Sequence, residues 1–270
     1  MNKNMLIRIL VSIIAIPAIL FIIYLGKLPF LFFVSVIAII SLNEFYSFIK
    51  QKNIQPQLII GNMSAVIILF NTYYHFIDLR ILLLGIVFIL SLIELFRNKN
   101  SSIYNLGGSL IGIFYIVFFL SSLINIREFD SINYEKGGLL ILSMIITIWS
   151  CDSAAYFGGI SCGKHKLFPR VSPKKSWEGS IFGFVFSIIA MIILQKFVID
   201  FITLQQAVIM GAIIGIFAQI GDLIESLFKR DAGVKDSSNL IPGHGGFFDR
   251  FDSLIFISPI IEIIIKLLNI

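Results

Sequence analysis

The segment KRDAGVKDSSNLIPGHGGFFDRFD, residues 229–252, is the longest stretch of polar and glycine residues in a chain that otherwise consists mostly of Ile, Leu, Phe and Val. Hydrophobic residues make up 57% of the 270 residues, charged residues make up only 14%, and the mean hydropathy is +0.95. Soluble globular domains carry about 25% charged residues. The composition therefore excludes a soluble domain and indicates an integral membrane protein.

Apolar runs flank this segment and recur along the whole chain. Because a helix needs about 20 apolar residues to span a bilayer, the sequence predicts nine transmembrane helices, at residues 6–26, 28–49, 57–76, 79–96, 103–126, 137–159, 178–199, 204–228 and 251–268. The first run is longer than the apolar region of a signal peptide, and no cleavage-type site follows it. It is therefore interpreted as a retained membrane span.

The predicted fold is an all-α integral membrane protein, a polytopic bundle of about nine transmembrane helices. We divide it into N-terminal membrane helices (1–130) and a C-terminal membrane region (131–270). Most of the 21 Lys and Arg residues lie on the same side of the membrane as the N-terminus in this arrangement of helices. Loops rich in Lys and Arg stay on the cytoplasmic side. The N-terminus and the polar loops 160–177 and 229–250 are therefore expected on the cytoplasmic face of the cell (inner) membrane.

Acidic residues gather where the predicted helices meet the second of these loops. Spacings of three or four residues place them on one face of each helix: Asp222, Glu225, Ser226 and Lys229 on one, and Asp249 and Asp252 on the next. A charge at the bilayer centre costs about 2.5–3.5 kcal/mol, so such acids need a partner or a function. Oxygen-only ligands suit hard cations such as Mg²⁺ rather than zinc. Carboxylates solvated by lipid headgroups or neutralised by Lys229 are the alternative.

Basic residues and glycines surround the acids. The glycines at 243, 245 and 246 permit positive φ and close backbone approach, as a phosphate-binding loop requires. The loop also carries Lys229, Arg230, Lys235, His244 and Arg250. The earlier loop repeats this composition, with Asp152 before it and with Lys164, Lys166, Arg170, Lys174 and Lys175 in it. Taken alone, such a basic run more often contacts lipid headgroups.

Carboxylates beside basic groups at a membrane boundary indicate nucleotidyl or phosphoryl transfer, in which charge on reacting phosphates must be offset. The stretch from Ser226 to Asp252 also resembles the signature of the phosphatidate cytidylyltransferases, or CDP-diacylglycerol synthases. It fits S-x-apolar-K-R-x(4)-K-D-x-small-x(2)-apolar-P-x-H-G-G-apolar-x-D-R-apolar-D without departure. A second resemblance covers 152–159, 163–167 and 172–179, whereas the first 130 residues match only as hydrophobic helices.

The resemblance implies an Mg²⁺-dependent reaction in phospholipid biosynthesis. The phosphate of phosphatidate attacks the α-phosphorus of CTP in line, giving CDP-diacylglycerol and pyrophosphate. It also implies a cytoplasm-facing polar cavity, a dimerisation or lipid-facing role for residues 1–130 and a catalytic region at residues 131–270. A homodimer, a second cation such as K⁺ and no nucleic-acid partner are expected as well. The expected metal ligands are Asp222, Glu225, Asp249 and Asp252, and the expected catalytic residues are Asp222, Lys229, Asp249 and Arg250. The expected substrate-binding residues are Asp152, Lys164, Lys174, Lys175, Ser226, Arg230, Lys235, His244, Gly245 and Gly246.

Other interpretations stay open at this point. A CTP-dependent lipid-alcohol kinase, or a cytidylyltransferase for another lipid phosphate, would share CTP and Mg²⁺, although the complete signature argues against both. An ion-coupled transporter would place acids near mid-membrane in symmetry-related halves, whereas these acids cluster in the C-terminal half. A structural scaffold would leave Asp152, Asp222, Asp249 and Asp252 unexplained.

Overall fold

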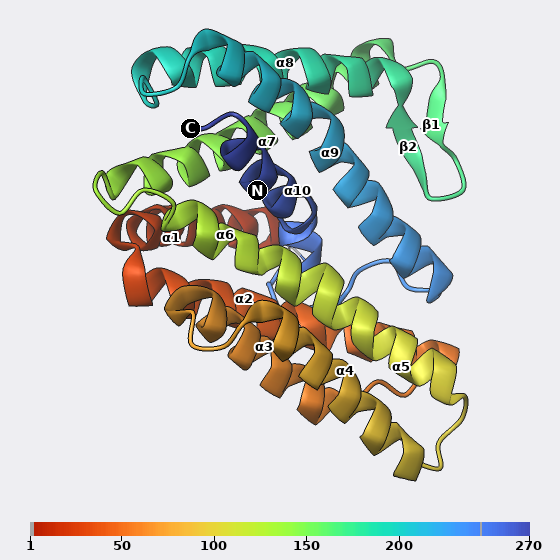
Figure 1. The fold of residues 1–270 in the computed structure, drawn as a ribbon. Coiled ribbons are helices and arrows are strands. Elements are labelled where there is room, and N and C mark those ends of the chain that lie inside the picture. Colours follow the sequence, from red (N-terminus) through yellow and green to blue (C-terminus); the bar gives the residue numbers. More distant parts are fainter. Residues whose placement is uncertain (1–2, 244) are drawn as a thin grey trace. The chain divides into compact units, whose positions relative to one another are not determined.

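The structure, a computed structural model, describes residues 3–243 and 245–270 and is almost entirely helical (Figure 1). Its elements are α1 (Lys3–Leu25), α2 (Lys27–Ile49), the short turn η1 (Lys50–Lys52), α3 (Leu58–Tyr74), α4 (Leu79–Phe96), α5 (Ser102–Ile111), the π-helix η2 (Gly112–Phe118), α6 (Phe119–Arg127), α7 (Glu135–Cys162), β1 (Lys166–Phe168), β2 (Ser172–Ser176), α8 (Trp177–Phe197), α9 (Leu204–Asp231) and α10 (Phe248–Leu267).

Helices occupy every predicted apolar stretch, and α5, η2 and α6 together form one continuous helical stretch. Among the described residues, six helical stretches are long and apolar enough to cross a membrane: Lys27–Lys52, Leu79–Phe96, Ser102–Arg127, Glu135–Cys162, Trp177–Phe197 and Leu204–Asp231. Two further apolar helices, Val11–Leu25 and Leu58–Tyr74, are shorter. Helix α10 contains several charged residues, including Asp249, Arg250 and Asp252. A helical membrane protein is thus confirmed, and the count of nine spans stays a prediction.

The described fold is nearly all-α, as predicted, with a two-stranded antiparallel hairpin in the first polar loop that the sequence analysis did not predict. Strands β1 and β2 pair with Lys166 opposite Ser176 and Phe168 opposite Ser172. The hairpin leads directly into α8, whose first turn is capped by the Ser176 hydroxyl oxygen, which accepts a hydrogen bond from the Gly179 N–H at 3.2 Å. The Glu178 carboxylate accepts from the Lys164 N–H at 3.1 Å. Together these bonds fix the base of the hairpin on α8.

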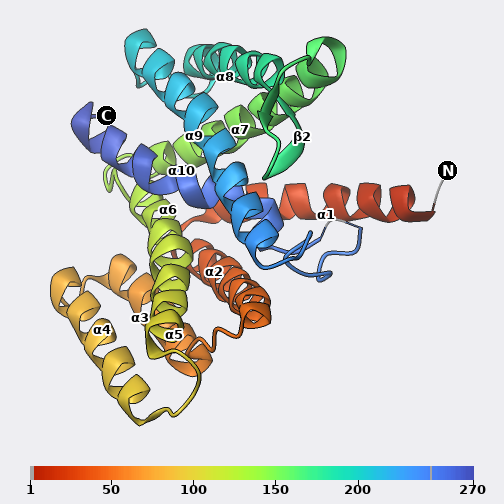
Figure 2. The ribbon, with the colours of Figure 1, turned by 90° about the vertical axis from the view of Figure 1, so that its right-hand side faces the viewer.

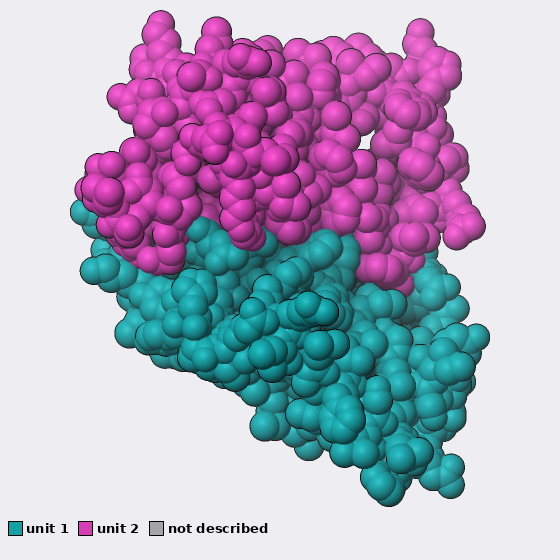
Figure 3. Space-filling model, in the orientation of Figure 1, with its two compact units in different colours: residues 1–125, 229–251 teal, residues 126–228, 252–270 magenta. Residues whose placement is uncertain are grey.

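The chain forms two compact units, which Figure 3 colours separately. Unit 1 comprises Met1–Asn125 and Lys229–Phe251. Its core surrounds Tyr46 on α2, whose hydroxyl donates to the carbonyl of Ser109 at 2.8 Å. A Cβ at Gly61 or Gly112 would come within 2.6 Å or 2.5 Å of the Tyr46 ring, so only glycine lets α3 and η2 approach α2 this closely.

Unit 1 also contains a buried polar network around Glu94 on α4, which is 2% exposed. Its carboxylate accepts hydrogen bonds from Gln57 Nε2 at 2.9 Å, Asn105 Nδ2 at 2.8 Å and Arg97 Nη1 at 2.8 Å. A buried charge with these partners is satisfied. We interpret this network as structural, because it ties α4 to α5 and to the start of α3.

Unit 2 comprises Ile126–Phe228 and Asp252–Ile270 and contains α7, α8 and most of α9 and α10, whose ribbons Figure 2 shows. Glycines lie at the contacts between these helices. A Cβ at Gly179 on α8 would lie 2.6 Å from the carbonyl oxygen of Ala155 on α7. A Cβ at Gly221 on α9 would lie 2.7 Å from Cβ of Phe256 on α10. Small residues let helices approach closely in membranes. The contact at Gly221 brings the neighbouring Asp222 up against α10.

The Asp130 carboxylate is one of the groups that order the connection between α6 and α7, and its pKa predicts a pH effect. The pKa of Asp130 is lowered from about 3.8 to about 2. The largest cause is the hydrogen bond from the Asn133 N–H, and the second is the ammonium of Lys136 at 2.9 Å. Ionised Asp130 therefore stabilises the fold above about pH 4, and this contribution is lost as the pH falls toward 2. In thermal unfolding in detergent, Asp130→Asn is expected to have a lower melting temperature than the wild type at pH 7. Its melting temperature should also fall less steeply between pH 4 and pH 2. Equal acid sensitivity of the variant and the wild type would contradict this assignment.

Candidate active site

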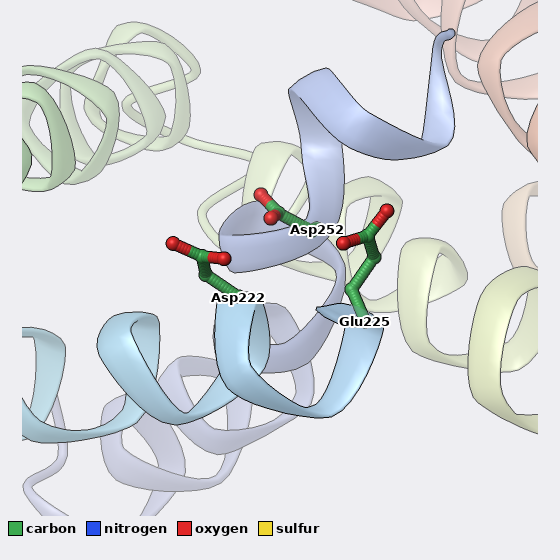
Figure 4. A group of neighbouring side chains, drawn as sticks. All are labelled: Asp222, Glu225 and Asp252. Carbon is green, nitrogen blue, oxygen red and sulfur yellow. The ribbon is translucent and has the colours of Figure 1, made fainter. Parts of the chain in front are cut away.

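Three carboxylates of unit 2, which we call the acid cluster, meet where α9 packs on α10. Asp222 and Glu225 come from α9 and Asp252 comes from α10, and one oxygen of each lies within 4.8 Å of the others (Figure 4). Glu225 is 1% exposed, whereas Asp222 and Asp252 are half-buried. Helical spacing places Asp222 and Glu225 on one face of α9, and the packing of α10 adds Asp252, so three of the four predicted metal ligands lie together.

Other predicted residues surround the acid cluster. The ammonium of Lys175, on β2, lies 2.6 Å from Asp222 Oδ2. The hydroxyl of Ser226 donates to Asp222 Oδ1 at 3.4 Å. Asp152 on α7 interacts electrostatically with both Asp222 and Lys175. Four carboxyl groups and one ammonium therefore gather in one region of unit 2, and carboxylate oxygens grouped in this way can bind a cation.

The donor set of the acid cluster fits a hard divalent cation. All three side chains offer carboxylate oxygens, which Mg²⁺ prefers, and Mg²⁺ proteins commonly supply only one or two such ligands, with the rest from phosphates and water. The described residues bring neither Cys nor His into this group, so the softer ligands typical of zinc are missing from it. The arrangement suits chemistry on phosphates.

We call residues 229–251, the part of the signature that belongs to unit 1, the signature segment. It folds around Asp249, which lies in the first turn of α10. Asp249 Oδ1 lies 2.7 Å from the ammonium of Lys229, and the two side chains are only 5% and 11% exposed. Asp249 Oδ2 also accepts hydrogen bonds from the Ser237 N–H at 3.0 Å and the Gly246 N–H at 2.8 Å. The structure thus places Asp249 among loop donors, and its expected role as a metal ligand stays a prediction.

Glu44 on α2 holds the same segment, and the sequence analysis missed it. Its carboxylate accepts hydrogen bonds from the hydroxyls of Ser237 and Ser238 and from the N–H groups of Phe247 and Phe248. One signal was present in the sequence: an acid deep in an apolar run, which needs a partner or a function. The partner lies about 200 residues further along the chain, so no local pattern reveals it.

The glycines of the segment have the geometry that the sequence predicts. Gly243 and Gly245 adopt positive φ values of 75° and 83°, which other residues rarely adopt. A Cβ at Gly246 would lie 2.1 Å from Ser237 Oγ and 2.5 Å from Glu44 Oε2. The backbone at Gly246 therefore lies close to the side chains of Ser237 and Glu44.

The remaining predicted residues lie at the surface of their units. Lys164 and Lys174 flank or belong to the hairpin and are exposed, as are Arg230, Lys235 and Arg250 in the signature segment. The guanidinium of Arg230 donates to the carbonyl of Val234 at 3.2 Å. His244 lies outside the described residues. Exposed basic side chains of this kind commonly bind anionic groups.

Comparison with known proteins connects these features to a family. The pattern of the cytidylyltransferase family matches residues 6–268. The phosphatidate cytidylyltransferase of Bacillus subtilis is 32% identical over 268 residues, which cover 97% of this chain and 98% of the relative. Those of Staphylococcus saprophyticus and Staphylococcus aureus are each 33% identical, over 97% of this chain and 99% of the relative. The similarity therefore includes the N-terminal half, where the sequence motifs provided only hydrophobic helices.

Proposed function

This chain belongs to the cytidylyltransferase family, and we propose that it is a phosphatidate cytidylyltransferase, which converts CTP and phosphatidate into CDP-diacylglycerol and pyrophosphate. The observation that carries the proposal is the end-to-end similarity to proteins of that name. The acid cluster, where the apolar helix α9 meets α10, supports it, because developing charge on reacting phosphates must be offset by a charged site.

In the proposed reaction a phosphate oxygen of phosphatidate attacks the α-phosphorus of CTP. A new P–O bond forms, the bond from the α-phosphorus to the bridging oxygen breaks, and pyrophosphate leaves with the electron pair. All groups involved are anionic, so the protein's contribution is to position them and to offset their charge.

Asp222, Glu225 and Asp252 would hold a divalent cation, Mg²⁺ in this proposal. When bound, the ion neutralises phosphate charge and orients the triphosphate. Asp222 also holds Lys175 at 2.6 Å, which keeps an ammonium beside the carboxylates. A second cation such as K⁺ and a metal contact by Asp249 belong to the same proposal.

The exposed basic residues have a role in the proposal as phosphate ligands. Lys164 and Lys174 lie at the hairpin, and Arg230, Lys235 and Arg250 lie in the signature segment. Lys and Arg bind phosphate through charge-assisted hydrogen bonds. In the proposal the N-terminus and both loops face the cytoplasm, where CTP is dissolved, and the enzyme is a homodimer in the cell membrane.

The test uses purified protein in detergent with phosphatidate, Mg²⁺ and CTP labelled in separate reactions at the α- or the γ-phosphate. We expect the α-label in the lipid product and the γ-label in pyrophosphate, because the bond between the α- and β-phosphates breaks. A CTP-dependent lipid kinase would transfer the γ-label instead and would leave CDP. Folded protein that labels lipid from neither substrate would contradict the proposal.

A further inference from the structure

Glu44 is a buried acid in a membrane helix, and all of its described hydrogen bonds go to the signature segment. It is 4% exposed, on α2 (Lys27–Ile49). A buried charge costs several kcal/mol unless hydrogen bonds or opposite charges satisfy it. The donors come from residues 193 to 204 positions further along the chain. The carboxylate therefore makes a long-range connection between the N-terminal half and the signature segment.

Both oxygens of this carboxylate are used. Oε1 accepts from Ser238 Oγ at 2.5 Å and from the Phe247 N–H at 3.0 Å. Oε2 accepts from Ser237 Oγ at 2.9 Å and from the Phe248 N–H at 2.8 Å. An ionised carboxylate offers about four acceptor sites, so these donors use its capacity fully. No side chain with a single oxygen could replace it.

Two of these donors are backbone groups at the start of α10. The first N–H groups of a helix have no partner within the helix, and a carboxylate there also interacts favourably with the helix dipole. In this protein the cap comes from a different helix. The ring of Phe248, which is fully buried, adds an apolar anchor 6.2 Å from that of Phe45 and 6.1 Å from that of Phe48, both on α2.

Glu44 and Asp249 are linked through one residue. Ser237 Oγ lies 2.9 Å from Glu44 Oε2 and 3.0 Å from Asp249 Oδ2. Asp249 in turn pairs with Lys229 at the end of α9. A displacement of Glu44 would therefore move Ser237, the start of α10 and the acid on its first turn.

We propose that Glu44 is a positioning residue for cytidylyl transfer: from α2 it fixes the signature segment and the first turn of α10, and through Ser237 it fixes Asp249. The inference rests on the proposed function. Asp252 follows Asp249 by one turn of the same helix, so a shift at the start of α10 also affects a member of the acid cluster. A misplacement of about 1 Å can lower a rate about 100-fold.

The test compares Glu44→Gln with the matched control Glu94→Gln, a second buried acid of unit 1 with no described contact to the signature segment. Glutamine keeps the shape but replaces one acceptor oxygen by a donor. We expect Glu44→Gln to lower kcat about 100-fold with a much smaller change in the KM for CTP and phosphatidate. Glu94→Gln is expected to lower the melting temperature and to leave kcat of the folded protein unchanged.

Two additional variants approach the same contact. In Gly246→Ala the added Cβ would press on Glu44 Oε2, so kcat should fall as in Glu44→Gln. Ser238→Ala removes one of the four donors and should have a smaller effect. A Glu44→Gln protein with a lower melting temperature but unchanged kcat would overturn the positioning role.

Hydrogen exchange separates this inference from the proposed function. If the wild type makes no product from CTP and phosphatidate, the proposed function fails, but the contact can still be measured. Faster amide exchange across residues 237–248 in Glu44→Gln, and not in Glu94→Gln, would support the connection. Unchanged exchange in that segment would contradict it regardless of activity.

Discussion

Replacing Asp222 by Asn is expected to lower the rate of CDP-diacylglycerol formation by about 100- to 1,000-fold, the effect of removing one strong electrostatic contact from an active site. Asp222 belongs to the acid cluster and also holds Lys175 at 2.6 Å. The substitution removes one negative charge from the proposed cation site. It also removes the carboxylate that pairs with the ammonium of Lys175. The measurement is initial rate against Mg²⁺ concentration, and the variant should need more Mg²⁺.

Asp231→Asn is the matched control for this prediction. Asp231 lies at the end of the same helix, its side chain is 74% exposed, and its described ion pair with Lys52 spans 3.3 Å. Exposed pairs contribute at most about 1 kcal/mol, so the control should retain both its rate and its Mg²⁺ dependence. Binding of Mn²⁺, followed by electron paramagnetic resonance without CTP, provides a readout independent of turnover. Equal Mn²⁺ affinity of Asp222→Asn and the wild type would exclude Asp222 as a ligand.

Lys229→Met is expected to destabilise the protein by about 3–5 kcal/mol, the range observed when one partner of a buried ion pair is removed. Lys229 and Asp249 are 2.7 Å apart and nearly buried, so the substitution removes the ammonium that pairs with a nearly buried carboxylate. Methionine preserves most of the side-chain volume, which separates the loss of charge from the loss of packing. The measurement is the free energy of unfolding from a denaturing-detergent titration in mixed micelles.

The double variant Lys229→Met/Asp249→Asn tests the physical cause. Because it removes both charges, it should recover part of the stability that Lys229→Met loses, whereas independent effects would add. Activity should stay low in both variants, since Asp249 orders the signature segment through Ser237 and Gly246. Strictly additive losses of stability would show that the pair is not coupled.

Most of the acid cluster could be predicted from the sequence because its geometry is local. Asp222 and Glu225 lie one turn apart on one helix, and helix periodicity alone places them on one face. The glycines of the signature segment were predictable for the same reason, since φ and close approach depend on the residue itself. The hairpin at 166–176 was missed, because strands of three and five residues with several lysines lack a clear apolar alternation.

Composition and apolar periodicity were sufficient to predict a helical membrane protein, the positions of its helices and the two polar loops in which acidic and basic residues gather. Which carboxylates lie together depends on the packing of the helices: Asp252 joins Asp222 and Glu225, while Asp249 contacts Lys229 and Ser237. Packing also decided that Glu44, from the N-terminal half, holds the signature segment. The physical reason is that spacing along a helix fixes only its own faces, whereas contacts between helices depend on close packing at residues such as Gly221 and Gly246.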